Sequence, residues 1–132
     1  MTAITVKFSI QLLINQAISL GETIAEIRVT GPKGSKVIRA VVDTGATNAV
    51  IDEELARELG MVTMGGDEVT LADGSVDKVG VGSAQVEIHG ITRIVPVYIY
   101  KETLVGLTTL EAAGLRVNPV SETLEKVRGK LL

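Results

Sequence analysis

The chain has 132 residues, 45% of them hydrophobic and 2% aromatic, and its 13 basic and 16 acidic side chains give a net charge of −3. This length provides one core and excludes a bilobal enzyme, and the absence of Cys and the single histidine exclude disulfides, thiolate catalysis, zinc–thiolate sites and His clusters within one chain. The slight acidic balance and the scarcity of aromatic rings argue against a nucleic-acid surface, so any chemistry must use carboxylates, hydroxyls, Lys or Arg side chains, or the backbone.

The apolar residues are biased toward strand formers, because Val and Ile together number 30 whereas Leu numbers 13. β-branched side chains suit a pleated, half-buried surface, so the composition predicts a mostly β fold. The most apolar stretch, Phe8 to Leu20, is interrupted by polar residues and is shorter than the roughly 18 apolar residues of a membrane span. It also lacks the continuous apolar middle of a signal peptide. We therefore expect a cytoplasmic protein with no membrane partner.

Alternation of apolar and polar residues predicts strands at Ile4–Ile14 and Glu22–Thr30. A turn is predicted at Gly31-Pro32-Lys33-Gly34, and a third strand at Val37–Val42. This third strand runs directly into Asp43, the first residue of a loop of small side chains. Because the sequence contains no repeat, linker or low-complexity segment, we expect residues 1–132 to form a single domain.

Asp52 is expected to cap a short helix, since two acidic residues follow it and apolar residues precede Gly60 at helical spacing. Beyond this helix, Glu68–Leu71 and Val76–Val81 alternate as strands do. The residues that join them are Ala72, Asp73, Gly74 and Ser75. Asp-Gly between alternating segments is a strong hairpin signal, so we expect a projecting hairpin.

Two further strands, Ser83–Ile88 and Thr92–Tyr100, are predicted around a turn at His89 and Gly90. With no partner cluster, His89 is interpreted as a turn residue rather than a ligand.

A second short helix is predicted after Leu104, Val105 and Gly106. Thr108 and Glu111 have the spacing of a capping box, and Gly114 can end this helix. The chain then continues through Leu115–Val117, a turn at Asn118-Pro119, and an amphipathic stretch near Thr123–Val127.

One stretch combines a reactive group with a structured position, namely Asp43, Thr44, Gly45 and Ala46 after an apolar strand. A carboxylate at a strand end, bordered by hydroxyls and by the amides of small residues, can be hydrogen-bonded and still be reached by a substrate. The alternative is that Asp43 and Thr44 only organise a turn, as these residue types often do.

The chain resembles the retropepsin-like aspartic proteases, the single-domain, retroviral-type family that also occurs as free-standing bacterial and archaeal proteins. Asp43-Thr44-Gly45-Ala46 is similar to the family's catalytic loop, and the hairpin tip at residues 72–75 lies where the family carries its flap. Leu104-Val105-Gly106 is similar to the second-half signature that packs beside the catalytic loop, and a helix at about Thr109–Ala113 follows it. The resemblance covers a core of about residues 22–117 and implies a single-lobe acid-protease barrel with a flap hairpin and one or two short helices.

The resemblance implies that Asp43 is catalytic, that Thr44 braces two loops across an axis, and that Gly45 contacts the shared water. Peptide hydrolysis by this chemistry needs two carboxylates that share one proton. Only one of the five Asp residues stands in an Asp-Thr-Gly loop, so we expect a homodimer whose two copies of Asp43 form the dyad. The flap would hold an extended peptide by β-augmentation, and no cofactor or metal is expected.

Three departures from the family pattern affect the expected dimer contacts and the expected contacts with substrate. Leu107 stands where a polar or charged residue is usual, and the hairpin tip has no aromatic residue. Both ends are longer than in the retroviral enzymes, so the subunit interface could differ.

Val50, Ile51 and Val81 are candidate pocket walls. The alternative function is a non-catalytic dimerisation or peptide-binding module with the same fold.

Overall fold

The period-two alternation of the sequence becomes strand geometry in residues 22–128, the part of the chain that the computed structural model describes. In β2 (Thr23–Gly31), Ala25, Ile27 and Val29 are buried and the residues between them are exposed. This strand pairs antiparallel with β3 (Gly34–Val42) along its whole length. The two predicted strands and their turn are thus confirmed. The strand predicted at Ile4–Ile14 lies outside the described residues.

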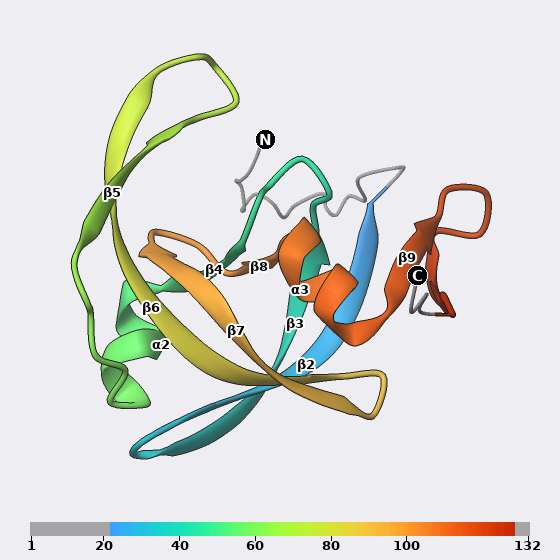
Figure 1. Cartoon of the computed structure of the whole chain (residues 1–132), viewed down its shortest axis with the longest axis horizontal. Coiled ribbons are helices and arrows are strands. Elements are labelled where there is room, and N and C mark those ends of the chain that lie inside the picture. The colour runs from blue at the N-terminus through green and yellow to red at the C-terminus, as the bar shows by residue number, and fades with distance from the viewer. Residues whose placement is uncertain (1–21, 129–132) are drawn as a thin grey trace.

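Seven strands form one sheet that closes on itself (Figure 1). Its order is β2-β3-β8-β4-β7-β6-β5, and an additional antiparallel pairing between β2 and β6 closes six of these strands into a barrel. The remaining strands of this sheet are β4 (Ala49–Asp52), β5 (Gly66–Thr70), β6 (Val76–Ile88), β7 (Ile91–Tyr100) and β8 (Leu104–Val105). The predicted mostly β, single-lobe acid-protease fold is confirmed.

The barrel encloses a core of small and β-branched side chains. Its members with no exposed surface include Val29, Ile51, Val97 and Val105. Because β-branched side chains pack well on a pleated surface, the excess of Val and Ile over Leu fills a narrow barrel interior. Leu110 and Ala113 close one end of this core from α3 (Leu107–Ala113).

The two described helices differ in how they begin. Asp52 caps α2 (Glu53–Glu58) as predicted, since its carboxylate accepts hydrogen bonds from the amides of Glu54 and Leu55 at 2.8 and 3.3 Å. The capping box predicted for α3 is wrong. Gly106 is the N-cap there, no side chain caps the helix, and α3 therefore starts at Leu107 rather than after Thr108.

The strands differ from the prediction in two places. The segments predicted at 76–81 and 83–88 are one continuous strand, β6, because Gly82 stays within the ladder to β7 opposite Val97. No strand was predicted at residues 49–52, where the short strand β4 pairs in parallel with β7. The predicted turn at His89 and Gly90 is confirmed, with φ of 52° and 76°, as a two-residue hairpin turn requires.

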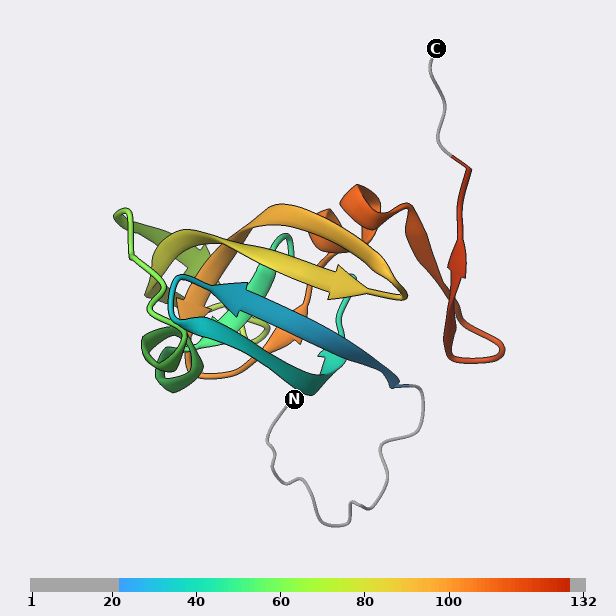
Figure 2. The same ribbon diagram turned by 90° about the horizontal axis from the view of Figure 1, so that it is seen from below.

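The last described elements form a separate two-stranded sheet of β9 (Leu115–Asn118) and β10 (Thr123–Lys126). Figure 2 shows this hairpin at the end of the barrel away from the β5–β6 hairpin. Leu115 and Leu124 are buried and attach it to the main core. The amphipathic stretch predicted near Thr123–Val127 is therefore mainly a strand.

Candidate active site

The loop that begins at Asp43 is fixed by backbone contacts with the second half of the chain. The Asp43 amide donates to the carbonyl of Val105 at 2.9 Å, directly where β3 and β8 pair in parallel. On the other side of the loop, the amides of Leu107 and Thr108 donate to the carbonyls of Ala46 and Thr47 at 2.8 and 2.9 Å. The loop is therefore held at both ends by the segment around β8.

Gly106 explains why this segment can approach the loop so closely. A Cβ atom at this position would overlap with the carbonyl group of Asn48 and would lie 2.9 Å from the carbonyl oxygen of Ala46. Only a residue without a side chain fits between these backbone groups. The structure thus brings Leu104, Val105 and Gly106 into contact with the loop that carries Asp43.

Within the loop, the Asp43 carboxylate turns back onto its own backbone. The Oδ1 atom of Asp43 accepts a hydrogen bond from the Gly45 amide at 2.9 Å, and the main-chain carbonyl of Asp43 accepts one from the Ala46 amide at 3.1 Å. Asp43, Thr44 and Gly45 are exposed, and Ala46 is half-buried. An exposed carboxylate with a preset orientation can reach a ligand or a second protein chain without rearrangement of the loop.

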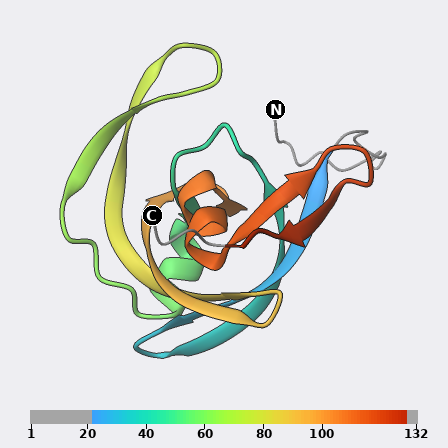
Figure 3. The same cartoon turned by 45° about the vertical axis from the view of Figure 1, so that its right-hand side comes forward.

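The predicted hairpin projects beyond the barrel, on the same side as the loop between β3 and β4 (Figures 1 and 3). Its strands, β5 and β6, pair from Gly66 opposite Gly80 to Thr70 opposite Val76. The amide of Leu71 donates to the carbonyl of Ser75 at 2.8 Å and closes the tip. Figure 1 shows the tip curving toward the side of the Asp43 loop.

The tip residues organise the turn among themselves. Both the amide and the hydroxyl of Ser75 donate to Oδ1 of Asp73, at 2.9 and 2.6 Å. These hydrogen bonds, the hydroxyl first, hold the pKa of Asp73 below its usual value. Ala72 and Gly74 are exposed, and Gly74 has a φ of 87°. The backbone of the tip is therefore open to solvent, while the Asp73 carboxylate is occupied locally.

The other aspartates lie apart from Asp43. Asp52 caps α2, Asp67 lies on β5, and Asp77 on β6 accepts a hydrogen bond from the Tyr100 hydroxyl. Within residues 22–128, no group of three or more His, Asp or Glu could hold a metal ion. The described part of one chain thus presents Asp43 as a single carboxylate in its loop.

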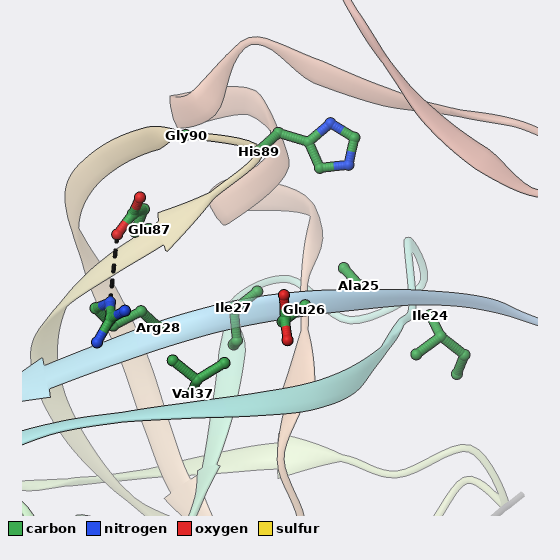
Figure 4. Close-up of a pocket in the computed structure, with 9 residues that line it drawn as sticks. All are labelled: Ile24, Ala25, Glu26, Ile27, Arg28, Val37, Glu87, His89 and Gly90. Carbon is green, nitrogen blue, oxygen red and sulfur yellow. Dashed lines mark ion pairs between the residues drawn. The ribbon is translucent and has the colours of Figure 1, made fainter.

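A shallow cavity of about 400 Å³ lies elsewhere, along the outer face of β2 (Figure 4). Ile24, Val37 and His89 line it, and Arg28 and Glu87 form an ion pair across its floor at 3.5 Å. Its lining shares no residue with the Asp43 loop or with the projecting part of the β5–β6 hairpin at residues 66–80, so we do not place the chemistry there. His89 occupies a turn at its edge, in agreement with its interpretation from the sequence.

The candidate pocket walls divide in the structure. Val50 and Val81 are half-buried, which leaves part of each side chain available to a ligand. Ile51 has no exposed surface and packs in the barrel core, so its assignment to a pocket wall is wrong. Neighbours on a strand point to opposite faces, and Val50 and Ile51 accordingly differ in burial.

Sequence reasoning missed the contact between Tyr100 and Asp77. Tyr98 and Tyr100 alternate on β7, a pattern that by itself indicates packing or interface residues. The structure gives Tyr100 a hydrogen bond to a carboxylate 23 positions away. The sequence offers no local signal for that pairing, because it depends on how β6 lies beside β7.

Comparison with known proteins adds two findings. A family model described as aspartyl protease matches residues 25–115. The search of curated proteins finds no match. In addition, no helix among residues 22–128 has the length and apolar character needed to cross a membrane.

Proposed function

The chain belongs to the aspartyl protease family, and from that premise we propose that it is a homodimeric aspartic endopeptidase. In this proposal Asp43 and Asp43 of a second copy form the catalytic dyad. The observation that carries the proposal is the exposed Asp43 carboxylate in an Asp-Thr-Gly loop braced by Gly106. The predicted cytoplasmic location stays a prediction.

The number and the positions of the aspartates favour an active site built from two copies of the chain. The sequence has five Asp, and the four others cap a helix, lie on β5, organise the hairpin tip or bind Tyr100. A two-fold axis next to the Asp43 loop would bring identical carboxylates together with one motif per chain. Thr44, which is exposed beside Asp43, would brace the two loops, and Leu107, 40% exposed at the loop base, would add an apolar contact.

The dyad would supply both the base and the acid. Two carboxylates about 3 Å apart cannot both ionise, so the pair holds one proton. The ionised carboxylate takes a proton from water, whose oxygen attacks the peptide carbonyl carbon, and the protonated one gives its proton to the substrate. As the tetrahedral intermediate collapses and the C–N bond breaks, the carboxyl that took the proton from water gives it to the departing amine nitrogen. The other carboxylate takes a proton from a hydroxyl of the intermediate, which restores the shared proton. Gly45 would contact the attacking water through its backbone.

The β5–β6 hairpin would act as the flap over this dyad. Ala72, Asp73, Gly74 and Ser75 present exposed backbone groups that could pair with an extended peptide. Closure of the hairpin would exclude water and order the substrate. The half-buried aliphatic residues Val50 and Val81 favour apolar side chains near the cleaved bond.

Cleavage of an unfolded protein substrate between about pH 3 and 7 tests the proposal. We expect the wild type to produce new peptide termini and Asp43→Asn to produce none above background. Asp67→Asn is the matched control, since it removes an exposed carboxylate from β5. Equal cleavage by wild type and Asp43→Asn would contradict the enzyme and favour the non-catalytic peptide-binding or dimerisation module.

The shared dyad has a separate test in the mass of the active species. Sedimentation of wild type and Asp43→Asn is expected to show a dimer in both, because the substitution keeps the side-chain shape. Mixing active wild type with an excess of Asp43→Asn should reduce activity by forming dimers with one aspartate. Full activity of a species that sediments as a monomer would overturn the two-chain site.

A further inference from the structure

The β5–β6 hairpin leaves the barrel before its own strands end. The ladder between β6 and β7 stops at the pair Gly80 and Ile99, whereas β6 continues back to Val76. From Val76 to Val79 its partner is β5, and a two-stranded ribbon alone is only marginally stable in water. Something beyond the ribbon's own ladder must therefore set the direction in which it projects.

Contacts at the base of the ribbon stop at the same level as the barrel ladder. The Met64 amide donates to the carbonyl of Val81 at 2.7 Å, and the Val81 amide donates to the carbonyl of Gly65 at 3.0 Å. These bonds attach the chain that enters β5 to the part of β6 still paired with β7. Past Gly80, β5 is the strand that pairs with β6.

A side-chain hydrogen bond reaches past that level. The Tyr100 hydroxyl donates to Oδ2 of Asp77, three positions farther along β6 than Gly80. The other oxygen of Asp77 accepts from the Lys78 amide at 2.8 Å, which fixes the carboxylate. The ammonium of Lys101 lies 5.4 Å from the centre of the Tyr100 ring. The contact thus joins the ribbon to the end of β7 through a charge-assisted hydrogen bond.

The electrostatics of the two partners agree with this geometry. The hydrogen bond from Tyr100 is the main cause that lowers the pKa of Asp77, followed by the Lys78 amide, with a contribution from the charge of Lys101. The bond to Asp77 is likewise the main cause that raises the pKa of Tyr100 to about 12, ahead of burial. The proton therefore stays on Tyr100 and the charge on Asp77 across the whole neutral and mildly acidic range.

Tyr100 is rigidly connected to the Asp43 loop. It lies opposite Asp52 in the parallel pairing of β7 with β4, and four residues later Leu104 pairs with both Val41 and Val50. The Thr103 hydroxyl between them accepts a hydrogen bond from the Asp52 amide at 2.9 Å. The hydrogen bond from Tyr100 therefore connects the ribbon to the same strands that hold the Asp43 loop.

We propose that Tyr100 and Asp77 are positioning residues of the peptidase, a latch that holds the β5–β6 hairpin at the angle from which it closes over the Asp43 loop. The inference rests on the proposed function for its catalytic meaning, but the latch itself is a property of the fold. Without it, the hairpin explores more directions, and substrate binding must restrict them. Loss of the latch is therefore expected to weaken substrate binding rather than to slow the chemical step, because the entropy of ordering the hairpin is lost on binding.

The decisive variant is Tyr100→Phe, which removes one oxygen and keeps the ring. In purified full-length protein we expect the KM for a peptide substrate to rise by about 3- to 10-fold, with kcat within about twofold of the wild type. Asp77→Ala should give the same change, and the double variant should be no worse than either single one. The matched controls are Tyr98→Phe on the same strand and Asp67→Ala on the same hairpin, both expected to keep the wild-type KM.

A second readout does not depend on activity. Amide hydrogen exchange over residues 66–79 should accelerate by about 10-fold in Tyr100→Phe, while exchange in β3 and β8 stays unchanged. The pKa of the Asp77 carboxyl, followed by NMR, should rise toward the ordinary Asp value in the same variant. A cooperative melting transition only slightly below that of the wild type would show that the variant folds normally.

The outcomes separate the two proposals. If the wild type cleaves no substrate but Tyr100→Phe accelerates exchange in the hairpin alone, the latch holds and the peptidase proposal fails. If the wild type is an active peptidase and Tyr100→Phe leaves KM and hairpin exchange unchanged, the latch is overturned. Equal acceleration in β3 and β8 would also overturn it, because the contact would then support the whole fold.

Discussion

The loop at residues 43–48 and the β5–β6 hairpin lie on the same side of the barrel, but they are held there by different means. The loop is clamped by backbone hydrogen bonds to Val105, Leu107 and Thr108, and Gly106 packs directly against it. The outer part of the hairpin is a two-stranded ribbon joined to β7 by the Tyr100–Asp77 bond. In the proposed peptidase, the loop would keep its geometry and the hairpin would move as a cover over the carboxylate site.

The largest effect is expected at the fixed region. Asp43→Asn should lower kcat/KM by roughly 10³-fold or more, because an amide cannot take part in sharing a proton between two carboxyls. The free energy of unfolding should change little, since the side chain is exposed. Peptide cleavage assays and chemical denaturation of the same preparations check both statements. A variant that keeps a tenth of the activity would show that Asp43 is not the reacting group.

Gly106→Ala tests the clamp itself. The new methyl group would overlap with the Asn48 carbonyl group, so either the loop or β8 must move. We expect a loss of about 3 kcal/mol in the free energy of unfolding, at the upper end for overpacking. Urea denaturation measures it, and activity should be lost together with stability. An unchanged unfolding midpoint would mean that the loop moves at little cost in free energy, and it would contradict the description of the loop as the tightly held region.

Gly74→Ala makes the same chemical change in the hairpin. No atom lies within 4 Å of the new methyl group, but the φ of 87° is unfavourable for alanine. The expected cost is about 1 kcal/mol, from backbone strain alone. Urea denaturation of both variants gives the ratio between the losses in the free energy of unfolding for Gly74→Ala and Gly106→Ala. Similar losses at both positions would remove the distinction between a packed loop and an open tip.

The pH dependence of the latch gives a smaller effect. The folded-state pKa of Asp77 is lowered, so its contribution to stability is present above the unfolded pKa and is lost as pH falls through the lower folded value. The pKa of Tyr100 is raised from 10.0 to about 12, so its contribution is present below pH 10 and is lost as pH rises toward 12. The stability difference between wild type and Tyr100→Phe should therefore be constant near neutrality and shrink at both extremes. Denaturation across pH measures it, and a difference that grows in acid would contradict the assignment.

The smallest effect concerns the helix behind the loop. Thr109 is 2% exposed, and within residues 22–128 its buried hydroxyl has no hydrogen-bond partner. Thr109→Val replaces that hydroxyl by a methyl group of similar size, so we expect a gain of about 1 kcal/mol in the free energy of unfolding. Thermal denaturation checks it, with activity unchanged. A loss of stability would show that the hydroxyl is satisfied in solution.

Much of the barrel could be predicted because its signals are local. Alternation located β2, β3 and β7, Asp-Gly located the β5–β6 hairpin, and Asp52 located the start of α2. β4 and β8 were not predicted, because strands of four and two residues are too short to show a periodic pattern. The capping box failed because Gly106 must already serve as the N-cap to fit against Asn48, which moves the helix start.

The site divides in the same way. The Asp43 loop is a contiguous motif, so its residues could be named from the sequence and a family resemblance. Ile51 was misplaced because one residue decides which face of a strand a side chain occupies. The pairing of Tyr100 with Asp77 is long-range, because it depends on the register of β6 on β7. No composition or residue spacing in the sequence predicts it.

The strand order of the sheet also determines where it could add further strands. It ends at β5, which pairs with β6 on one side, so its other edge is an open row of backbone groups within the described chain. Open edges invite uncontrolled pairing between molecules. Asp67 and Glu68 stand on this strand. Their adjacent negative charges repel a second copy of the same edge, which disfavours edge-to-edge aggregation of the projecting hairpin.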